Sequence, residues 1–221
     1  MIWADRILGF NQSLELTARL PDGVVVMNPF RNRETFSLCT QFYKKYYSDN
    51  NPRRLILGIN PGRHGAGLTG IPFTDPIKLE ENCGIPNQLP RKPELSADFI
   101  YKVIAVYGGP EKFYSRFYFS SVSPLGFVKD GKNLNYYDIR ELQEVVYEFF
   151  MKTIKQQIDF GIDTTRCYCL GEGKNVAFLH RINKETHLFG EIVSLPHPRF
   201  IMQYRRKQVD QYIQLYLERL S

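Results

Sequence analysis

Apolar residues follow two different spacings along this chain. Short runs rich in β-branched and aromatic residues alternate with longer segments in which apolar residues recur every three or four positions. The short runs predict strands at 54–59, 117–122, 166–170 and 191–195, and the longer segments predict helices at 4–20, 34–46, 97–107, 139–158, 174–182 and 203–220. Because strands separated by helices favour a parallel sheet covered on both faces, we predict an α/β fold with three layers, α/β/α, and a mainly parallel four-stranded central sheet.

The pattern indicates one domain, residues 1–221. No repeat or Gly/Pro-rich linker divides the chain, and 221 residues with 43% hydrophobic composition suffice to bury a core. The longest apolar runs, such as 24–27 and 55–57, are far shorter than the roughly 20 residues that cross a bilayer. The first six residues show no secretory signal. We therefore expect a cytoplasmic protein, associated with the nucleoid if bacterial, with no membrane partner.

Charge and cysteine usage narrow the choice of partner. The 29 Lys and Arg residues exceed the 23 Asp and Glu residues, and the resulting net charge of +6 favours a polyanionic partner because cations at phosphates release counterions. Many basic proteins bind no nucleic acid, so this charge counts only beside a site. The four cysteines, at 39, 83, 167 and 169, form no CxxC pair, which argues against a zinc site and a disulfide framework.

The turn after the first predicted strand holds the strongest candidate site. Five glycines occupy positions 58, 62, 65, 67 and 70, with Asn60 and Phe73 bracketing most of them. Glycines let a planar ligand approach the main chain closely. The turn lacks the Gly-Lys-Ser/Thr ending of nucleotide-hydrolase loops and the glycine spacing of dinucleotide-binding loops. Because ligands bind at the carboxyl ends of parallel strands, we expect this segment to form the floor of a pocket.

The residues of this turn resemble a known family. The run Gly-Ile-Asn-Pro-Gly at 58–62, followed by Phe73, is similar to the first motif of the single-strand-selective monofunctional uracil-DNA glycosylases, with the same spacing from Asn to Phe. Weaker similarities lie at 119–125, 131–134 and 195–199. The resemblance covers residues 54–206. It implies the α/β/α architecture and a divergent, bacterial-type DNA glycosylase that removes uracil in base excision repair.

The resemblance also implies roles for residues of the glycine-rich turn. Asn60 would hold the attacking water and Phe73 would stack on the flipped base, while the main chain from Gly62 to Ala66 would line the pocket near C5 of uracil. Asn is a poor base, but a glycosidic bond that breaks early to an oxocarbenium-like sugar needs a well-placed water more than a strong proton acceptor. The alternatives are a simple turn role for Asn60 and core packing for Phe73.

A second constellation follows the last predicted strand. His197 is held between Pro196 and Pro198, which fix its backbone, and the resemblance assigns it to the negative charge that develops on O2 of the departing uracil. Apolar wedges flanked by cations are what base extrusion requires, so we interpret the segment after His197 as inserting into DNA. A solvated start to the last helix is the alternative. The candidate DNA contacts are Arg199, Phe200, Ile201, Met202, Arg205, Arg206 and Lys207.

The chain departs from the family pattern in two places. The family's His-Pro-Ser-Pro-Arg is shortened to His197-Pro198-Arg199. In addition, alignment on Pro124 places Ser121 where the family has the Asn that reads the pyrimidine edge, and a single hydroxyl cannot replace the paired donor and acceptor of an amide. Other deaminated bases, such as hypoxanthine or xanthine, therefore remain an alternative to uracil.

Two further residues are weaker candidates. His64 lies within the glycine-rich turn, where it could meet a phosphate or the base, and Asp75 could help to position water, although an acidic residue in a Thr-Asp-Pro turn is usually a local cap. No lysine occupies a matched pocket position, so we expect no Schiff-base chemistry and no strand-nicking lyase activity.

The sequence thus predicts a monofunctional glycosylase that leaves an abasic site in DNA and needs neither a metal nor an organic cofactor. We expect a monomer by default, although no residue pattern fixes the oligomeric state or the preference for single- or double-stranded DNA. Two alternatives stay open: a glycosylase that prefers deaminated purines, and a non-catalytic nucleic-acid-binding or nucleotide-binding protein with the same fold.

Overall fold

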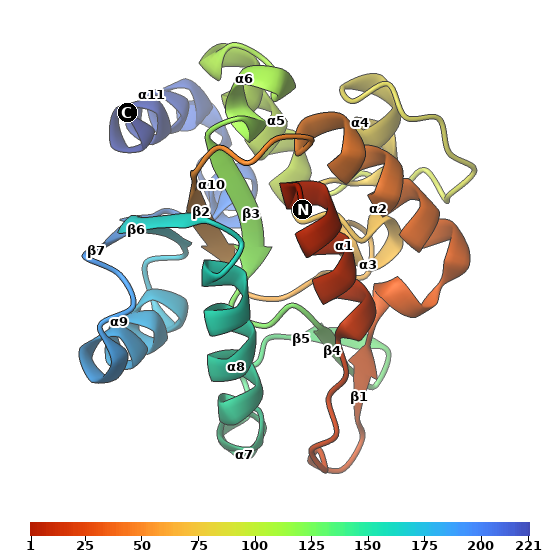
Figure 1. Ribbon diagram of the computed structural model, residues 1–221, viewed down its shortest axis with the longest axis vertical. Helices are drawn as coiled ribbons and strands as arrows, with labels where there is room; N and C mark the ends of the chain where they lie inside the picture. Colours follow the sequence, from red (N-terminus) through yellow and green to blue (C-terminus); the bar gives the residue numbers. More distant parts are fainter.

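A parallel four-stranded sheet forms the centre of the computed structural model, which describes residues 1–221 (Figure 1). The spatial order is β3-β2-β6-β7, and all three pairings are parallel. The strands run Arg53–Gly58 (β2), Phe117–Ser121 (β3), Ile162–Leu170 (β6) and Glu191–Leu195 (β7), which confirms all four predicted strands. Five of the six residues of β2 are buried, as expected for a strand with helices on both faces.

Helices cover both faces of this sheet. On one face, Ile56 of β2 and Phe119 of β3 lie against residues of α5, α6 and α11, and on the other face α8 and α9 contact β6. In Figure 1 the first group lies above the sheet and α8 and α9 lie below it. The three-layer architecture is therefore as predicted. The helices are α1 (Trp3–Ser13), α2 (Arg33–Tyr46), α3 (Ala66–Thr69), α4 (Pro76–Glu81), α5 (Leu95–Tyr107), α6 (Pro110–Tyr114), α7 (Arg140–Val145), α8 (Tyr147–Ile158), α9 (Lys174–Thr186), α10 (Pro198–Tyr204) and α11 (Val209–Leu220), with short 3-10 turns at Pro29–Arg31 and Arg206–Gln208.

Three of the predicted helices differ from the structure. The helix predicted at 4–20 ends at Ser13, because Leu14 is extended and its carbonyl accepts a hydrogen bond from the Asn28 side chain. The segment 139–158 divides into α7 and α8 at Val146. The segment 203–220 forms only the end of α10 and the whole of α11, with a 3-10 turn between them.

A second, smaller sheet was not predicted. It is antiparallel and consists of β1 (Val24–Met27), β4 (Gly126–Lys129) and β5 (Lys132–Leu134) in the order β1-β4-β5. Asp130 and Gly131 both have positive φ, 49° and 68°, and an Asp-Gly pair with this geometry makes the tight turn of a hairpin. The hairpin carries Asn133 and Leu134 toward the carboxyl end of β2.

A continuous core of 54 buried residues joins the layers. Arg53 is fully buried within it, where the guanidinium hydrogen-bonds to Asp49 and to the Tyr114 carbonyl and lies 4.8 Å from the ring centre of Tyr47. All four cysteines are buried free thiols. None of the helices is both long enough and apolar enough to span a membrane.

Candidate active site

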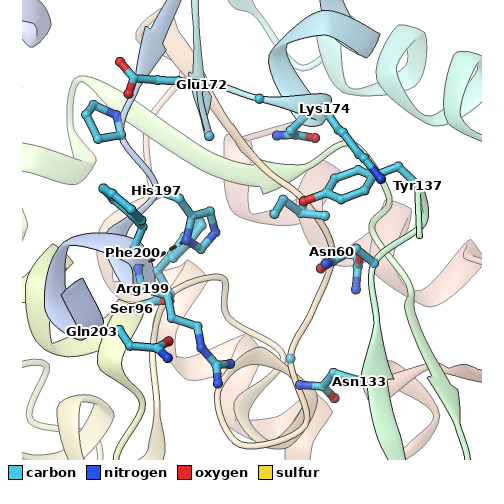
Figure 2. Close-up of a pocket in the computed structure, with 18 of the residues that line it drawn as sticks. Asn60, Ser96, Asn133, Tyr137, Glu172, Lys174, His197, Arg199, Phe200 and Gln203 are labelled. Carbon is cyan, nitrogen blue, oxygen red and sulfur yellow. Dashed lines mark hydrogen bonds between the residues drawn. The ribbon is translucent and has the colours of Figure 1, made fainter.

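A cavity of about 630 Å³ opens at the carboxyl ends of the central strands. It receives residues from the turns after β2, β6 and β7, from the second sheet, and from α10 (Figure 2). The turns after β2 and β7 carry the two constellations that the sequence analysis describes. The cavity-lining residues used below are Asn60, Gly62, Phe73, Glu94, Asn133, Glu172, Asn175, His197, Arg199, Phe200 and Tyr204.

Asn60 enters the cavity from the end of β2, and its amide is held by the second sheet. The Asn60 Nδ2 donates to the Leu134 carbonyl at 3.2 Å, and its Oδ1 accepts from the main-chain N–H of Tyr136 at 3.2 Å. A carbonyl oxygen accepts two hydrogen bonds, so Oδ1 keeps one lone pair for a ligand. The arrangement can hold a water molecule in a fixed position.

Phe73 forms one wall beside Asn60. Its backbone has φ 55°, which is unusual for a residue with a large side chain, and its ring centre lies 5.2 Å from that of Phe119 and 6.5 Å from that of His197. A Cβ atom on Gly58 would lie 2.7 Å from Phe73 Cζ. Only glycine at 58 allows the ring this close approach to β2.

His197 faces Asn60 from the opposite side of the cavity (Figure 2). It is the N-cap of α10, and its Nδ1 accepts from the main-chain N–H of Arg199 at 3.2 Å. The proton of the neutral ring therefore sits on Nε2, which is free to donate. Burial, with a smaller contribution from the positive charge of Arg199, lowers the pKa of His197 to about 4. The imidazole is neutral near pH 7.

A family model described as Uracil DNA glycosylase superfamily matches residues 44–221. The chain belongs to the uracil DNA glycosylase superfamily. The crystal structure of wild-type SMUG2 from Pedobacter heparinus is similar to this glycosylase over 99% of this chain and 96% of that chain, with 47% identity and a TM-score of 0.97. A comparison with curated protein sequences finds no match. These findings confirm the resemblance inferred from the first motif, and the protein is a DNA glycosylase.

Part of the predicted DNA-contacting segment of the glycosylase is wrong. Ile201 and Met202 are buried at 0% and 4% exposure, because α10 turns these two side chains into the core. Phe200 is 42% exposed, and Tyr204 on the next turn of the helix is 61% exposed, with ring centres 5.6 Å apart. The predicted contacts Arg199, Arg205, Arg206 and Lys207 are all exposed. The exposed aromatic pair is therefore Phe200 and Tyr204, which helical spacing three to four residues apart could have indicated.

Four other sequence candidates lie outside the main cavity. Ser121 and Ala66 are buried and line a small space of about 20 Å³ instead. His64 is exposed on the glycine-rich turn. Asp75 is 1% exposed and acts as the N-cap of α4, so its carboxylate is occupied by main-chain N–H groups. The local-cap interpretation of Asp75 is the one that the hydrogen bonds support.

Asn175 and Glu94 are two of the cavity residues of the glycosylase that the sequence does not predict. Asn175 hydrogen-bonds to the carbonyls of Gly58 and Leu170 and to the Tyr136 hydroxyl, so it ties together the ends of β2 and β6. Glu94 precedes α5 and has a pKa raised to about 7, chiefly by burial and secondly by the negative charge of Asp75. No local motif marks either residue, since both act through neighbours distant in the sequence.

Proposed function

We propose that this glycosylase hydrolyses the N-glycosidic bond of uracil in DNA and leaves an abasic site. Asn60 orients the attacking water, Phe73 stacks on the flipped base, and His197 donates from Nε2 to the O2 atom on which negative charge develops. The observation that carries the proposal is the placement of Asn60 and His197 on opposite sides of one cavity, each held by a hydrogen bond to the main chain. A donor held in advance where charge develops stabilises the transition state more than the ground state.

The face around the cavity supports DNA as the ligand. The exposed Phe200 and Tyr204 stand beside the opening, and the Arg205 guanidinium lies 5.4 Å from the Phe200 ring centre. An aromatic wedge next to cations can fill the space left in the base stack while the cations meet phosphates. We propose a monomer as the active form, because the residues assigned to the reaction lie together in this cavity. We place this activity in the cytoplasm, at the nucleoid if the protein is bacterial.

A preference for deaminated purines is the second candidate. Ser121 of β3 pairs with Gly58 of β2, and the Ser121 Oγ would lie 3.4 Å from a Cβ atom on that glycine. Ser121 lines only the small space outside the main cavity, so no amide side chain at this place reads the pyrimidine edge, and discrimination between a pyrimidine and a larger ring is weaker.

The test is an oligonucleotide panel carrying uracil, hypoxanthine, xanthine or thymine, single-stranded and paired, treated with alkali after incubation to reveal abasic sites. We expect cleavage of uracil DNA, and turnover lowered at least about 100-fold in Asn60→Ala and His197→Ala, the loss typical of a removed transition-state donor. His180→Ala, which removes an exposed histidine of α9 outside the cavity, is the matched control and should retain turnover. Absence of cleavage for every base, or full turnover in both cavity variants, would refute the proposal.

A further inference from the structure

Glu94 occupies the N-cap position of α5, yet its carboxyl group does not cap the helix. The main-chain N–H of Glu94 donates to Asp75 Oδ2 at 2.8 Å, which fixes the backbone, while the side chain turns toward the glycine-rich turn. A Cβ atom on Gly65 would overlap Glu94 Oε2, and one on Gly62 would lie 3.4 Å from Oε1. The carboxyl group therefore rests against the main chain that forms the floor of the cavity.

This carboxyl group lines the cavity and has no partner within the protein. Its oxygens make no hydrogen bond, and no cation lies within ion-pair distance of them. The charged groups that face it are Asp75 at the N-terminus of α4 and the exposed Arg199 on α10. His197 on α10 is neutral, and the cations Arg63 and Lys92 act, together with Arg199, on His64. Burial in the cavity wall and the negative charge of Asp75 favour the carboxylic acid form of Glu94 over the carboxylate.

DNA makes the charged form of Glu94 less favourable still. Entering phosphates bring negative charge to the cavity and attract Arg199, the one nearby cation that favours the carboxylate. Burial and Asp75 already raise the pKa of Glu94 to about 7, so little free energy is needed to bind a proton there. A protonated carboxyl group is also a hydrogen-bond donor, unlike a carboxylate.

We propose that Glu94 is a substrate-contacting residue that acts in its protonated form: DNA binding adds one proton to Glu94, and the resulting carboxylic acid donates a hydrogen bond to the nucleotide on the side of the cavity formed by the glycine-rich turn. This inference rests on the proposed function, because it requires DNA in this cavity. The Glu94 carboxylic acid adds a second hydrogen-bond donor besides Nε2 of His197, and the affinity for DNA becomes dependent on pH.

The experiment measures binding without turnover, at pH values from 6.5 to 8.5. The probe is a labelled oligonucleotide with one 2′-fluoro-2′-deoxyuridine, whose fluorine disfavours the oxocarbenium-like transition state. If only the neutral form of Glu94 binds, the competent fraction falls as pH rises past 7, and the Kd of the wild-type protein increases about 25-fold over this range. Burial and the positive charges of Lys92, Arg63 and Arg199 lower the pKa of His64, which favours its neutral form.

Three variants separate this proposal from a general charge effect. Glu94→Gln keeps a donor of similar shape and cannot ionise, so its Kd should stay nearly constant with pH and should fall below that of the wild type at pH 8.5. Glu172→Gln removes an equal charge from an exposed residue of the same cavity, so it should leave the pH dependence unchanged. Glu94→Ala lacks the donor and should bind more weakly than Glu94→Gln at every pH.

The outcomes are distinguishable from failure of the proposed function. If no form of the protein binds the probe, the proposed function itself is wrong. The inference about Glu94 is overturned if the wild type and Glu94→Gln bind with the same pH dependence. It is also overturned if Glu94→Gln binds normally but loses turnover with natural uracil DNA, as expected for loss of a general base. In both cases the proposed function stands.

Discussion

Replacing His197 by alanine should remove one hydrogen bond that matters mainly in the transition state. The Nδ1 of this residue is occupied by the main-chain N–H of Arg199, so Nε2 is the only ring atom left to donate. Uracil in the ground state carries a neutral carbonyl at O2, and the departing base carries a negative charge there. The donor therefore stabilises the leaving base far more than the bound base.

The expected magnitude follows from this geometry. Loss of one preorganised donor at a developing oxyanion typically costs about 10²–10³ in rate, or about 2.7–4 kcal/mol. We expect a loss of rate in the lower part of that range, because a neutral imidazole is a weaker donor than an imidazolium ion. His197→Ala should thus lower the single-turnover rate about 100-fold, and His197→Gln, which retains an N–H donor, should lose less.

Single-turnover cleavage with enzyme in excess is the appropriate assay, because slow release of the abasic product cannot mask the chemical step there. Binding of the 2′-fluoro oligonucleotide provides the control and should change little. Since the pKa of His197 is about 4, ionisation of the imidazole begins only as pH falls toward that value. The rate should therefore show no His197-dependent inflection between pH 5.5 and 8.5. An inflection near pH 6.5 that disappears in His197→Gln would refute the neutral-imidazole reasoning, as would a loss below tenfold in His197→Ala.

Two further predictions concern packing. Gly58→Ala places a methyl group 2.7 Å from Phe73 Cζ, so the ring must move; we expect a destabilisation of about 1–3 kcal/mol by thermal unfolding together with weaker uracil cleavage, and unchanged values for both would contradict the close approach. Phe200→Ala should weaken binding to DNA without lowering Tm, whereas Ile201→Ala should lower the free energy of unfolding by about 2–5 kcal/mol, because only Ile201 is fully buried. The reverse pattern would show that α10 is oriented differently.

The central sheet was predictable because each of its strands contains a compact apolar run. The predicted strand 191–195 matches β7 at both ends, whereas β6 begins at Ile162 and not at Arg166, because its first half is polar. The second sheet escaped prediction because its strands are short and two of them are partly polar, as in 132–134. The Asp130-Gly131 pair is the sequence feature that could have indicated the hairpin.

For the site, the sequence could predict residues that stand at strand ends within a motif, such as Asn60 and His197. It could not predict which side chains of 199–207 face outward, since that depends on where α10 begins. Pro198 starts the helix and sets its rotation, which buries Ile201. Glu94 and Asn175 lie outside any motif, and only the tertiary contacts bring them to the cavity.

The hydrogen bonds to Asn60 link the reaction to the hairpin of the second sheet and to the residues that follow it. The Leu134 carbonyl and the Tyr136 N–H come from a segment more than 70 positions away in sequence, and together they hold the amide at both ends. A change of register or length in that hairpin would rotate the amide while leaving the aromatic and basic surface intact. Variation at 126–136 is therefore a route by which a descendant of this enzyme could keep recognition of damaged DNA and lose excision, and thereby become a damage sensor.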